Sequence, residues 1–375
     1  MTGVALHVDQ LSFPAPGGIG TYLRNLVPAL GRQDPSLEIV PFRSRFEGDP
    51  PDEPALAHLP VEELDGSIRS LYPRWALTAR PWLPERVRRL DLVHATNPAA
   101  VPPAAPGQRL VVTVHDLAFL VLPGTFPRAW RWLYRVGLRA AVRRADAIVT
   151  PSRSTAEDLL SRTRVDPEKV FVTPLAASLS LGVDDPDAVL ARLKVPPPYL
   201  LFVGTLEPRK NLLRLVRAYR RVAQDGIPHA LVLAGPLGWQ GDRLLREIAL
   251  RGPGEIVLTG PLSDDELDAL YRGADAFVYP SLYEGFGLPV VEAMSRGLPS
   301  VVSTSSSLPE VAGDAALAVN PRSVRELASA IATIATDVAM AERLAAKARA
   351  RAERFSWDET ARRTLEMYER LLEAK

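Results

Sequence analysis

The sequence contains no cysteine, and that absence excludes disulfides, iron–sulfur clusters and zinc sites with thiolate ligands. Histidine is scarce as well: there are five, with no His-x-x-x-His pair, so no histidine metal site is indicated. Net charge is nearly absent, because 45 basic residues stand against 44 acidic ones. A balance of +1 argues against a nucleic-acid-binding protein, which would need a broad surface that neutralises phosphates.

Long hydrophobic runs are also missing. The N-terminus, MTGVALHVDQ, has no basic segment followed by a long apolar core, so no signal peptide is indicated. The most apolar long stretch, LVVTVHDLAFLVLPGTF, is interrupted by His115 and Asp116 and is too short for a membrane span. We therefore expect a cytoplasmic protein, which the missing cysteines also favour.

What the chain has is enough hydrophobic material for two domains, since it is 375 residues long and 47% hydrophobic. Short apolar runs alternate with longer helical patterns, which is typical of βαβ units and parallel sheets. The predicted strands are 4–8, 92–96, 110–115, 146–152 and 170–174, then 199–204, 230–235, 255–260, 276–281, 300–305 and 316–319. The sequence thus predicts an α/β protein with two open sheets joined near residues 178–198, and a final helix at 357–372.

A basic pair follows the first strand of the second half. The predicted strand ends at Gly204, and Asn211 is a good cap residue for a helix that begins there. Arg209 and Lys210 would then stand beside the positive N-terminal end of that helix, where a diphosphate binds favourably. The alternative is a solvated basic turn.

Two carboxylates with seven residues between them stand in the stretch YEGFGLPVVEAM. Glu284 falls in a predicted loop, and Pro289 fits the first turn of a helix that carries Glu292 and ends at Gly297. Ionised carboxylates accept hydrogen bonds, so each could bind a pair of sugar hydroxyls. The alternative is that Glu292 complements the helix dipole and Glu284 is solvated.

Just downstream, Ser307 and Glu310 have the spacing of a capping box, which predicts a structural role at the start of another short helix.

In the first half, a glycine-rich turn follows the first strand. Gly18 and Gly20 precede a helical pattern and would let backbone N–H groups approach a phosphate or a sugar, although a merely flexible loop is the alternative. Leu23 stands where a dinucleotide fingerprint needs its third glycine. His115 follows an apolar strand at its carboxyl end, where it serves either a ligand or the core.

A charge patch covers residues 67–144, which carry thirteen arginines against three acidic residues. Five of these arginines lie on one face of a predicted helix with Trp132 among them: Arg128, Arg131, Arg135, Arg139 and Arg143. A basic aromatic stripe of this kind is typical of contact with an anionic membrane surface. The alternative is an ordinary solvated helix face.

The chain resembles the retaining glycosyltransferases of family 4, which have the GT-B fold, in motifs that follow one another along nearly its whole length. They are GGIGTY, TVHDL, TPSRST, FVGTLEPRKN, LAGPLGW, YPSLYEGFGLPVVEAMSRGLPSVVS and SSSLPEVAGDAAL. The most specific is the E-x₇-E motif of Glu284 and Glu292. The resemblance implies two facing Rossmann-like domains with a cleft between them: an acceptor-binding domain at 1–180 and a donor-binding domain at 181–355. A C-terminal helix at 356–375 would cross back to the first domain.

The resemblance also assigns roles to residues. It implies that the donor diphosphate is held by Arg209 and Lys210, the ribose by Glu292, and the donor sugar by Glu284, with His115 beside the transferred sugar. The catalytic residues are then Arg209, Lys210, Glu284 and His115, and the donor-binding residues are Gly18, Gly20, Gly204, Gly285, Phe286, Gly287, Leu288 and Glu292. Retention would proceed by same-face attack assisted by the departing phosphate rather than by double displacement.

The implied activity is transfer of a hexose from a nucleotide-diphosphate sugar to a glycan or lipid-linked acceptor, as in polysaccharide biosynthesis, with no cofactor and no metal. The one D-x-D motif, Asp185 to Asp187, lies in the linker and not at a strand end. The motifs most resemble the mannosyl- and rhamnosyltransferase branch, so GDP-mannose is the first expected donor and a UDP-sugar the second. The chain departs from many relatives in having PLAASLS after the fifth strand and serines before SLPE.

Two other classes compete with this interpretation. A nicotinamide-dependent α/β enzyme is disfavoured by the missing glycine fingerprint. A nucleotide-sugar-binding protein without appreciable activity is disfavoured by the intact Arg-Lys pair and the paired glutamates. Peripheral contact with the inner face of the membrane is the expectation attached to the arginine stripe.

Overall fold

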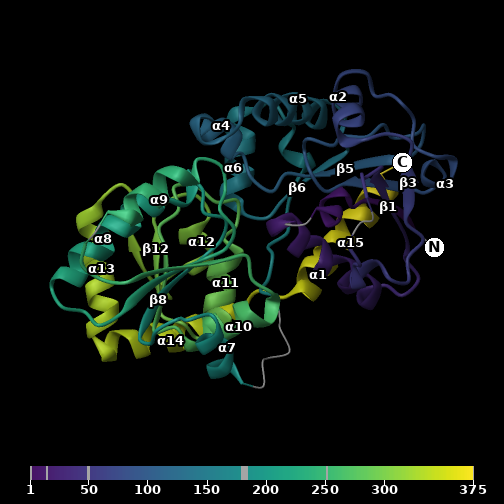
Figure 1. Cartoon of the computed structure of the whole chain (residues 1–375). Coiled ribbons are helices and arrows are strands. Elements are labelled where there is room, and N and C mark those ends of the chain that lie inside the picture. Colours follow the sequence, from purple (N-terminus) through teal and green to yellow (C-terminus); the bar gives the residue numbers. More distant parts are fainter. Residues whose placement is uncertain (1, 14–15, 49–50, 179–184, 251, 375) are drawn as a thin grey trace. The chain divides into compact units, whose positions relative to one another are not determined.

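The computed structural model describes residues 2–13, 16–48, 51–178, 185–250 and 252–374. It divides into two compact units: unit 1 is Met1–Leu175 with Ser356–Lys375, and unit 2 is Ala176–Phe355 (Figure 1). The predicted domain boundary between residues 180 and 181 falls on residues outside the described ones. Each unit is an α/β layer structure with a parallel sheet covered by helices, as the alternation of short apolar runs and helical patterns predicts.

Unit 1 has a seven-stranded sheet in the order β3-β2-β1-β4-β5-β6-β7. The strands are β1 (Gly3–His7), β2 (Glu38–Ser44), β3 (Glu62–Leu64), β4 (Leu92–Ala95), β5 (Arg109–Thr113), β6 (Ala147–Thr150) and β7 (Val170–Val172). The helices are α1 (Gly17–Gln33), α2 (Ile68–Thr78), α3 (Glu85–Arg88), α4 (Ala118–Val121), α5 (Arg128–Arg144), α6 (Arg153–Arg162) and α15 (Trp357–Glu373).

Two strands of unit 1 are missing from the sequence prediction. β2 contains Pro41, which cannot donate a ladder hydrogen bond and breaks the strand pattern, although Pro41 pairs in register with Leu6 of β1. β3 is only three residues long, EEL, and has no apolar run to recognise. The sequence predicted five strands for the first half, whereas the sheet of unit 1 has seven.

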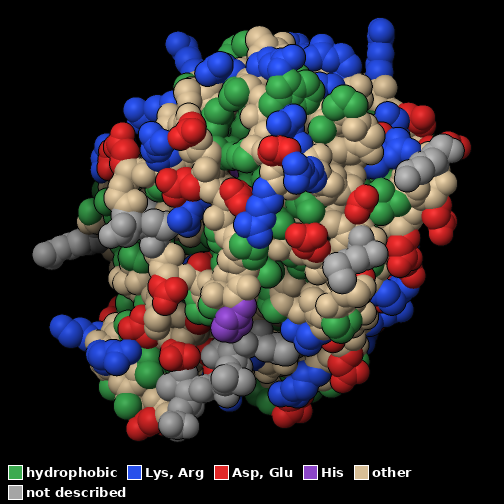
Figure 2. Space-filling model, turned by 90° about the vertical axis from the view of Figure 1, so that its right-hand side faces the viewer, with side chains coloured by type: hydrophobic (Ala, Val, Ile, Leu, Met, Phe, Trp, Pro, Cys, Tyr) green, Lys and Arg blue, Asp and Glu red, His purple; other side chains and the backbone are tan. Residues whose placement is uncertain are grey.

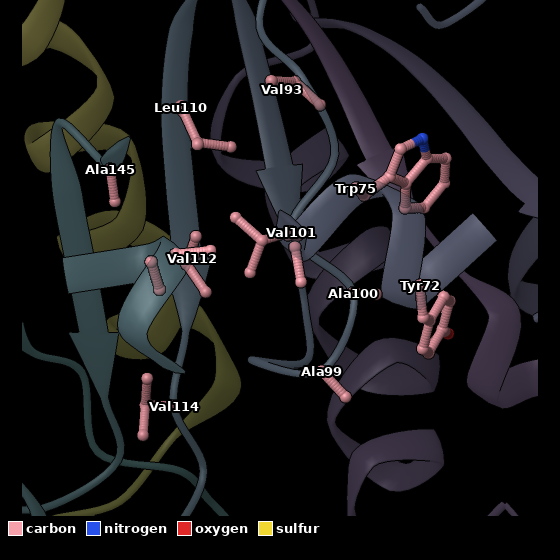
Figure 3. Packing of buried hydrophobic residues seen from close by; sticks show 14 of the residues in the cluster. Tyr72, Trp75, Val93, Ala99, Ala100, Val101, Leu110, Val112, Val114 and Ala145 are labelled. Atoms are coloured by element: carbon pink, nitrogen blue, oxygen red, sulfur yellow. The ribbon is translucent and has the colours of Figure 1, made fainter. Parts of the chain in front are cut away.

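Successive side chains of the central strands point to opposite faces of the sheet, as strand geometry requires. On β5, Leu110 and Val112 pack on the face covered by α2 and α5, whereas Val111 packs on the other face (Figure 3). That other face is covered by α15 through Met367 and Tyr368, both 1% exposed. Burial on both faces explains why these strands are almost continuously apolar.

The last helix belongs to unit 1, although the chain reaches it through unit 2. α15 packs against α1 (Figure 1) and is tied to the sheet by polar bonds. The Tyr368 hydroxyl lies 2.6 Å from Nδ1 of His94 on β4, and the Thr360 hydroxyl donates to the carbonyl oxygen of Pro174 at 2.5 Å. Ser356 caps the helix by accepting from the backbone N–H of Glu359.

Unit 2 has a six-stranded sheet in the order β10-β9-β8-β11-β12-β13, and every strand predicted for the second half is present. The strands are β8 (Tyr199–Val203), β9 (Ala230–Ala234), β10 (Ile256–Gly260), β11 (Ala276–Tyr279), β12 (Ser300–Ser303) and β13 (Ala316–Val319). The helices are α7 (Pro186–Arg192), α8 (Leu212–Gln224), α9 (Gly241–Ala249), α10 (Asp264–Gly273), α11 (Leu288–Ser295), α12 (Leu308–Ala312), α13 (Val324–Thr336) and α14 (Val338–Ala352). α7 begins at the D-x-D motif, whose Asp185 caps it.

In both sheets the strand order reverses next to the first strand of the unit, between β1 and β4 and between β8 and β11. In open parallel sheets of this kind, ligands bind beyond the carboxyl ends of the strands at that reversal. Each unit is thus expected to carry its binding residues in the loops after these strands. Among the described residues, none of the helices combines the length and hydrophobicity that a membrane span requires.

Candidate active site

At the strand reversal of unit 2, the loop after β8 packs closely against the loop after β9. Gly204 has φ +141° and Gly235, after β9, has φ +132°, conformations that side chains rarely tolerate. A Cβ at Gly235 would lie 2.4 Å from the carbonyl oxygen of Gly204, so the two loops fit together only with glycine there. A short 3₁₀ turn, η5 (Pro208–Lys210), follows. This packing fixes where Arg209 and Lys210 stand.

The predicted basic pair and the first predicted glutamate form one ion cluster. Lys210 Nζ donates to Oε1 of Glu284 at 2.7 Å and to the hydroxyl of Tyr279, at the end of β11, at 2.6 Å. Arg209 donates through one terminal nitrogen to Oε2 of Glu284 at 2.8 Å and to the carbonyl oxygen of Tyr283 at 2.9 Å. The cluster joins the loops after β8 and β11, the two strands that flank the reversal.

A fourth charged residue, Glu207, completes the cluster and was missed by the sequence analysis. It is 5% exposed, and its Oε1 accepts from Nε of Arg209 at 2.9 Å and from the other terminal nitrogen at 2.7 Å. Its position two residues before Arg209 in the EPRK stretch was the available signal. With two carboxylates and two cations, the formal charge of the four side chains sums to zero.

The electrostatics of the cluster favour charged groups despite burial. Burial opposes ionisation of Glu284, yet the charges of Arg209 and Lys210 outweigh it and hold the pKa of Glu284 at about 2. Burial lowers the pKa of Lys210, a shift that Glu284 counteracts. Burial raises the pKa of Glu207, with Arg209 counteracting. Glu284 is thus a permanent acceptor at neutral pH.

The loop that carries Glu284 is held by serines further along the chain. The N–H of Glu284 donates to the Ser306 hydroxyl at 2.8 Å. The Ser307 hydroxyl donates to the carbonyl oxygens of Glu284 at 3.1 Å and Phe286 at 2.8 Å. The predicted capping box of Ser307 and Glu310 is therefore wrong, because the Ser307 side chain is used by the loop and makes no cap bond to α12.

The helix start after this loop is as predicted. Gly287 has φ +105° at the N-cap of α11, Pro289 lies in the first turn, and Gly297 follows the last turn with φ +67°. Gly285, Phe286 and Leu288 are buried around it. A Cβ at Gly287 would lie 2.6 Å from the Leu308 side chain, so both space and backbone conformation select glycine.

The second glutamate, Glu292, has a different partner. Its Oε2 accepts from the hydroxyl of Tyr271 on α10 at 2.9 Å, and the Arg296 guanidinium lies 5.1 Å from the centre of the Tyr271 ring. Burial raises the pKa of Glu292 above its ordinary value. In the described part of the chain, Glu284 and Glu292 share no hydrogen-bond partner, so the E-x₇-E motif supplies two separate acceptors.

The predicted side-chain cap at Asn211 is wrong. Asn211 adopts a left-handed conformation (φ +65°), and its side chain accepts from no backbone N–H of α8; its Oδ1 accepts from the guanidinium of Arg214 at 2.9 Å. Its amide nitrogen donates instead to the carbonyl oxygens of Pro280 at 3.0 Å and Pro321 at 2.6 Å. The residue links the loop after β8 to those after β11 and β13, which rigidifies the support of the ion cluster.

In unit 1 the glycines lie inside a helix rather than in a turn before it. α1 begins at Gly17, so Gly18 is exposed in its first turn and Gly20 is buried. A Cβ at Gly20 would lie 2.3 Å from Cβ of Pro16, which explains the glycine. The prediction of a glycine-rich turn before the helix is therefore wrong, because these glycines belong to the first turns of α1.

His115 lies just beyond β5 and is neutral at physiological pH. Its Nε2 lies 3.1 Å from the carbonyl oxygen of Thr96, and its ring is 4.9 Å from that of Tyr22 on α1. Because the carbonyl oxygen only accepts, Nε2 carries the proton and Nδ1 is an acceptor. Burial lowers the pKa of His115 to about 4.

A further polar cluster of unit 1 was missed by the sequence analysis. At the end of β1, Nε2 of His7 lies 3.1 Å from Oδ2 of Asp9, and that oxygen also accepts from the hydroxyls of Ser44 at 2.6 Å and Tyr72 at 2.8 Å. The available signal was a His and an Asp at the end of the first strand. Within the described residues, no three His, Cys, Asp or Glu side chains are grouped so that they could hold a metal ion.

Comparison with protein families gives two matches in chain order. Residues 16–181 match the model described as Glycosyltransferase Family 4, and residues 191–351 match that described as Glycosyl transferases group 1.

Several curated relatives have mannosyltransferase names. The O-antigen chain mannosyltransferase B of Escherichia coli is 34% identical over 271 residues, which cover 70% of this chain and 71% of the relative. The MMP alpha-(1->4)-mannosyltransferase of Mycolicibacterium hassiacum is 30% identical over 359 residues, 90% of this chain and 85% of the relative. The serotype-specific mannosyltransferase WbdA of E. coli is 34% identical over 244 residues, 63% of this chain, which spans only 30% of that protein.

Solved structures share the fold over the whole chain. The sucrose-phosphate synthase from Thermosynechococcus elongatus superposes with a TM-score of 0.77 at 22% identity, covering 100% of both chains. The Anabaena protein Alr3699/HepE in complex with UDP-glucose gives a TM-score of 0.75 at 20% identity, covering 98% of this chain and 100% of that one.

Proposed function

The chain belongs to glycosyltransferase family 4 and is a glycosyltransferase of the GT-B type, and from that premise we propose its donor, its chemistry and its acceptor class. It transfers a hexose with retention from a nucleotide-diphosphate sugar, with GDP-mannose as the first candidate, to a glycan or lipid-linked acceptor. No metal ion or other cofactor takes part.

The observation that carries the proposal is the ion cluster at the strand reversal of unit 2. A diphosphate needs cations on buried, preorganised side chains, and Arg209 and Lys210 are held in place by Glu207 and Glu284. These two cations stabilise the charge that grows on the diphosphate as the bond between its oxygen and the sugar C1 breaks. The acceptor oxygen forms the new bond to C1 on the same face, and its proton passes to the departing phosphate oxygen.

The carboxylates bind hydroxyl groups of the donor. Glu284, ionised well below neutral pH, accepts from the hexose, together with the backbone of residues 285–288. Glu292, which already accepts from Tyr271, accepts from the ribose diol. Gly204 leaves the backbone beside Lys210 without a side chain: a Cβ there would make only an ordinary contact with Cε of Lys210 at 3.7 Å, and the φ of +141° is what favours glycine.

Unit 1 supplies groups suited to neutral hydroxyls. His115 is uncharged and offers Nδ1 as an acceptor, which fits a sugar hydroxyl. Gly18, exposed in the first turn of α1, and the buried Gly20 leave two positions at the start of that helix without a side chain.

A UDP-sugar is the second candidate donor, because the solved HepE structure with this fold contains UDP-glucose. A catalytically weak nucleotide-sugar-binding protein is the third candidate. The mannosyltransferase names of the curated relatives favour GDP-mannose over these.

The test is a binding and turnover panel. Thermal unfolding is measured with GDP, UDP, ADP, dTDP and NAD, each with and without a chelator; a ligand at about a hundred times its Kd adds about 2.7 kcal/mol of stability. We expect GDP to stabilise most, with no effect of the chelator. Hydrolysis of GDP-mannose, even slow, separates an enzyme from a mere binder. Stabilisation by UDP alone would replace the donor, and a requirement for a divalent cation would overturn metal independence.

The assignment of Glu292 is tested by Glu292→Ala. The variant should bind the donor more weakly because it lacks the ribose acceptor, while Ser295→Ala, one turn along the same helix, should bind it as the wild type does. Unchanged donor affinity in Glu292→Ala, measured by calorimetric titration, would disprove the assignment.

A further inference from the structure

The outer side of unit 1 carries a surface that the proposed transfer reaction does not use. α5 has six arginines and no acidic residue, and α2, which packs against it, has two arginines and no acidic residue. We call the exposed part of this pair the basic aromatic face. It consists of Arg128, Trp132, Arg135, Arg139 and Arg143 of α5 and Arg69, Arg74 and Leu77 of α2.

The face of α5 points directly away from the core. With about 100° per residue, the exposed arginines and Trp132 lie opposite the buried side of the helix. That buried side consists of Gly137, Leu138, Ala140 and Ala141. Trp132 is 49% exposed, and Leu77 of α2 is 61% exposed. Neither side chain belongs to the hydrophobic core cluster beneath these helices, so the core of unit 1 does not account for them.

Among the described residues, no acidic side chain forms a salt bridge with an arginine of this face, whereas neighbouring arginines outside it, Arg86, Arg89 and Arg109, do form such pairs. Residues 67–144 are all described and contain three acidic residues, Glu85, Asp91 and Asp116. Glu85 pairs with Arg89, Asp91 accepts from the N–H of Gly3, and Asp116 accepts from the N–H of Ala118. By contrast, two of the exposed arginines of α15 are paired, since Arg362 and Arg363 both donate to Glu359.

The space-filling view shows the same segregation. Lys and Arg side chains gather along the upper margin of Figure 2, at the height where α2 and α5 lie in Figure 1, with hydrophobic side chains among them. Acidic side chains appear lower on this face, interspersed with basic ones. One sign of charge mixed with apolar side chains is the composition of a surface that meets an anionic, partly apolar partner.

We propose that the basic aromatic face binds the anionic surface of a lipid bilayer. The arginines contact the headgroup phosphates, with their apolar stems covering the helix, and Trp132 enters the interfacial layer that indole rings prefer. A nucleic acid or another soluble polyanion would satisfy the arginines but leaves Trp132 and Leu77 without a role. The proposal goes beyond transferase activity and does not depend on the identity of the donor.

The experiment measures co-sedimentation of the whole chain with vesicles of phosphatidylcholine alone and of equal parts phosphatidylcholine and phosphatidylglycerol, without any sugar nucleotide. We expect binding to the anionic vesicles only, weakening as salt rises. Because each arginine near such a surface contributes a factor of about five, Arg135→Gln with Arg139→Gln should lower the partition coefficient about 25-fold. Trp132→Ala should reduce the quenching of tryptophan fluorescence by brominated lipid.

The matched control removes two exposed arginines from a packed helix pair in unit 2, Arg221→Gln on α8 with Arg325→Gln on α13. It changes the net charge equally and should leave binding unchanged. Thermal unfolding identical to wild type shows that each variant is folded. No binding to anionic vesicles at low salt, an equal loss in the control, or equally tight binding to heparin that Trp132→Ala leaves unchanged would each overturn the proposal. Since no donor is present, failure here would leave the transferase proposal intact.

Discussion

The two units share a strand order and differ in the chemistry at their strand ends. Unit 2 places two cations and two carboxylates there, paired so that they sum to zero, whereas unit 1 has at its strand ends the neutral His115 and the buried carboxylate of Asp9, which is held by His7, Ser44 and Tyr72. The surplus arginines of unit 1 are on its outside, on α5. The same scaffold is thus equipped for an anionic ligand in one unit and for neutral hydroxyls in the other, because the loops, not the sheet, determine the site.

The difference also affects the free energy of folding. Burying a charge is unfavourable unless it is paired, and removing one partner of a buried pair typically costs about 3–5 kcal/mol. Lys210 and Glu284 of unit 2 form such a buried pair, since both are less than a tenth exposed. A site that only needed to bind hydroxyl groups would have no reason to contain such a cluster.

The comparison is tested most strongly by removing a cation from unit 2. Lys210→Ala should lower kcat about 100- to 1,000-fold and change the donor KM far less, because the ammonium acts on charge that develops on the leaving diphosphate. Lys347→Ala, which removes an exposed lysine paired with Asp314, is the control. Steady-state kinetics with the donor found in the binding panel measures both. An unchanged kcat in Lys210→Ala would show that the cluster does not stabilise the leaving group.

Acid should distinguish the units in a different way. In unit 1, burial lowers the pKa of His94 to about 3 and that of His115 to about 4. In the unfolded chain the same side chains bind protons near pH 6.5, whereas in the folded unit they remain neutral there. Their contribution to stability is complete above pH 6.5 and declines as pH falls toward these values. In unit 2, Glu284 has its pKa lowered to about 2, and its contribution of about 3 kcal/mol is complete above pH 4.5 and lost toward pH 2.

Unit 1 should therefore begin to lose stability at higher pH than unit 2. Hydrogen exchange between pH 7 and pH 4, corrected for the intrinsic rate, measures this in peptides from β4 and β5 against peptides from β8 and β11. His94→Gln keeps a polar side chain that does not titrate and should reduce the loss in unit 1 alone. Earlier opening of unit 2 on acidification would contradict the assignment.

How far the sequence predicted these features depends on the range of the interactions. Alternating apolar runs are local signals, and they predicted all six strands of unit 2 and the final helix, whereas Pro41 concealed β2. The basic pair and the two glutamates were predicted from strand-end positions. Their direct pairing was not, because Glu284 is 74 residues from Lys210 in sequence.

The errors have the same origin. Asn211 and Ser307 carry side chains that usually cap helices, so local rules predicted caps. In the structure both side chains donate to carbonyl oxygens of distant loops, at Pro321 and Phe286 respectively. Tertiary hydrogen bonds replaced the local ones at the two places where the loops of the candidate site are held together.

Glu207 offers a smaller test of how the cations of unit 2 are positioned. Glu207→Gln keeps the size of the side chain but removes one of the two carboxylates that hold Arg209. If Glu207 orients the guanidinium for the diphosphate, the donor KM should rise about tenfold, equivalent to about 1.4 kcal/mol, with little change in kcat. Glu207→Asp should restore part of the affinity. Full donor affinity in Glu207→Gln would mean that Glu284 and the Tyr283 carbonyl position Arg209 without it.

The smallest expected effect concerns an uncharged hydrogen bond of unit 1. Tyr368→Phe removes the hydroxyl that lies 2.6 Å from Nδ1 of His94, a bond between buried neutral groups, and should cost about 1 kcal/mol of stability. The matched change in unit 2, Tyr219→Phe, removes a hydroxyl that donates to the carbonyl oxygens of His229 and Glu255 and should cost a similar amount. Urea unfolding, monitored by hydrogen exchange in each unit, measures the loss of stability in both variants. Because neither bond involves a charge, the two costs should agree, and a cost several times larger for Tyr368→Phe would show that α15 depends on this one bond rather than on its apolar packing against the sheet.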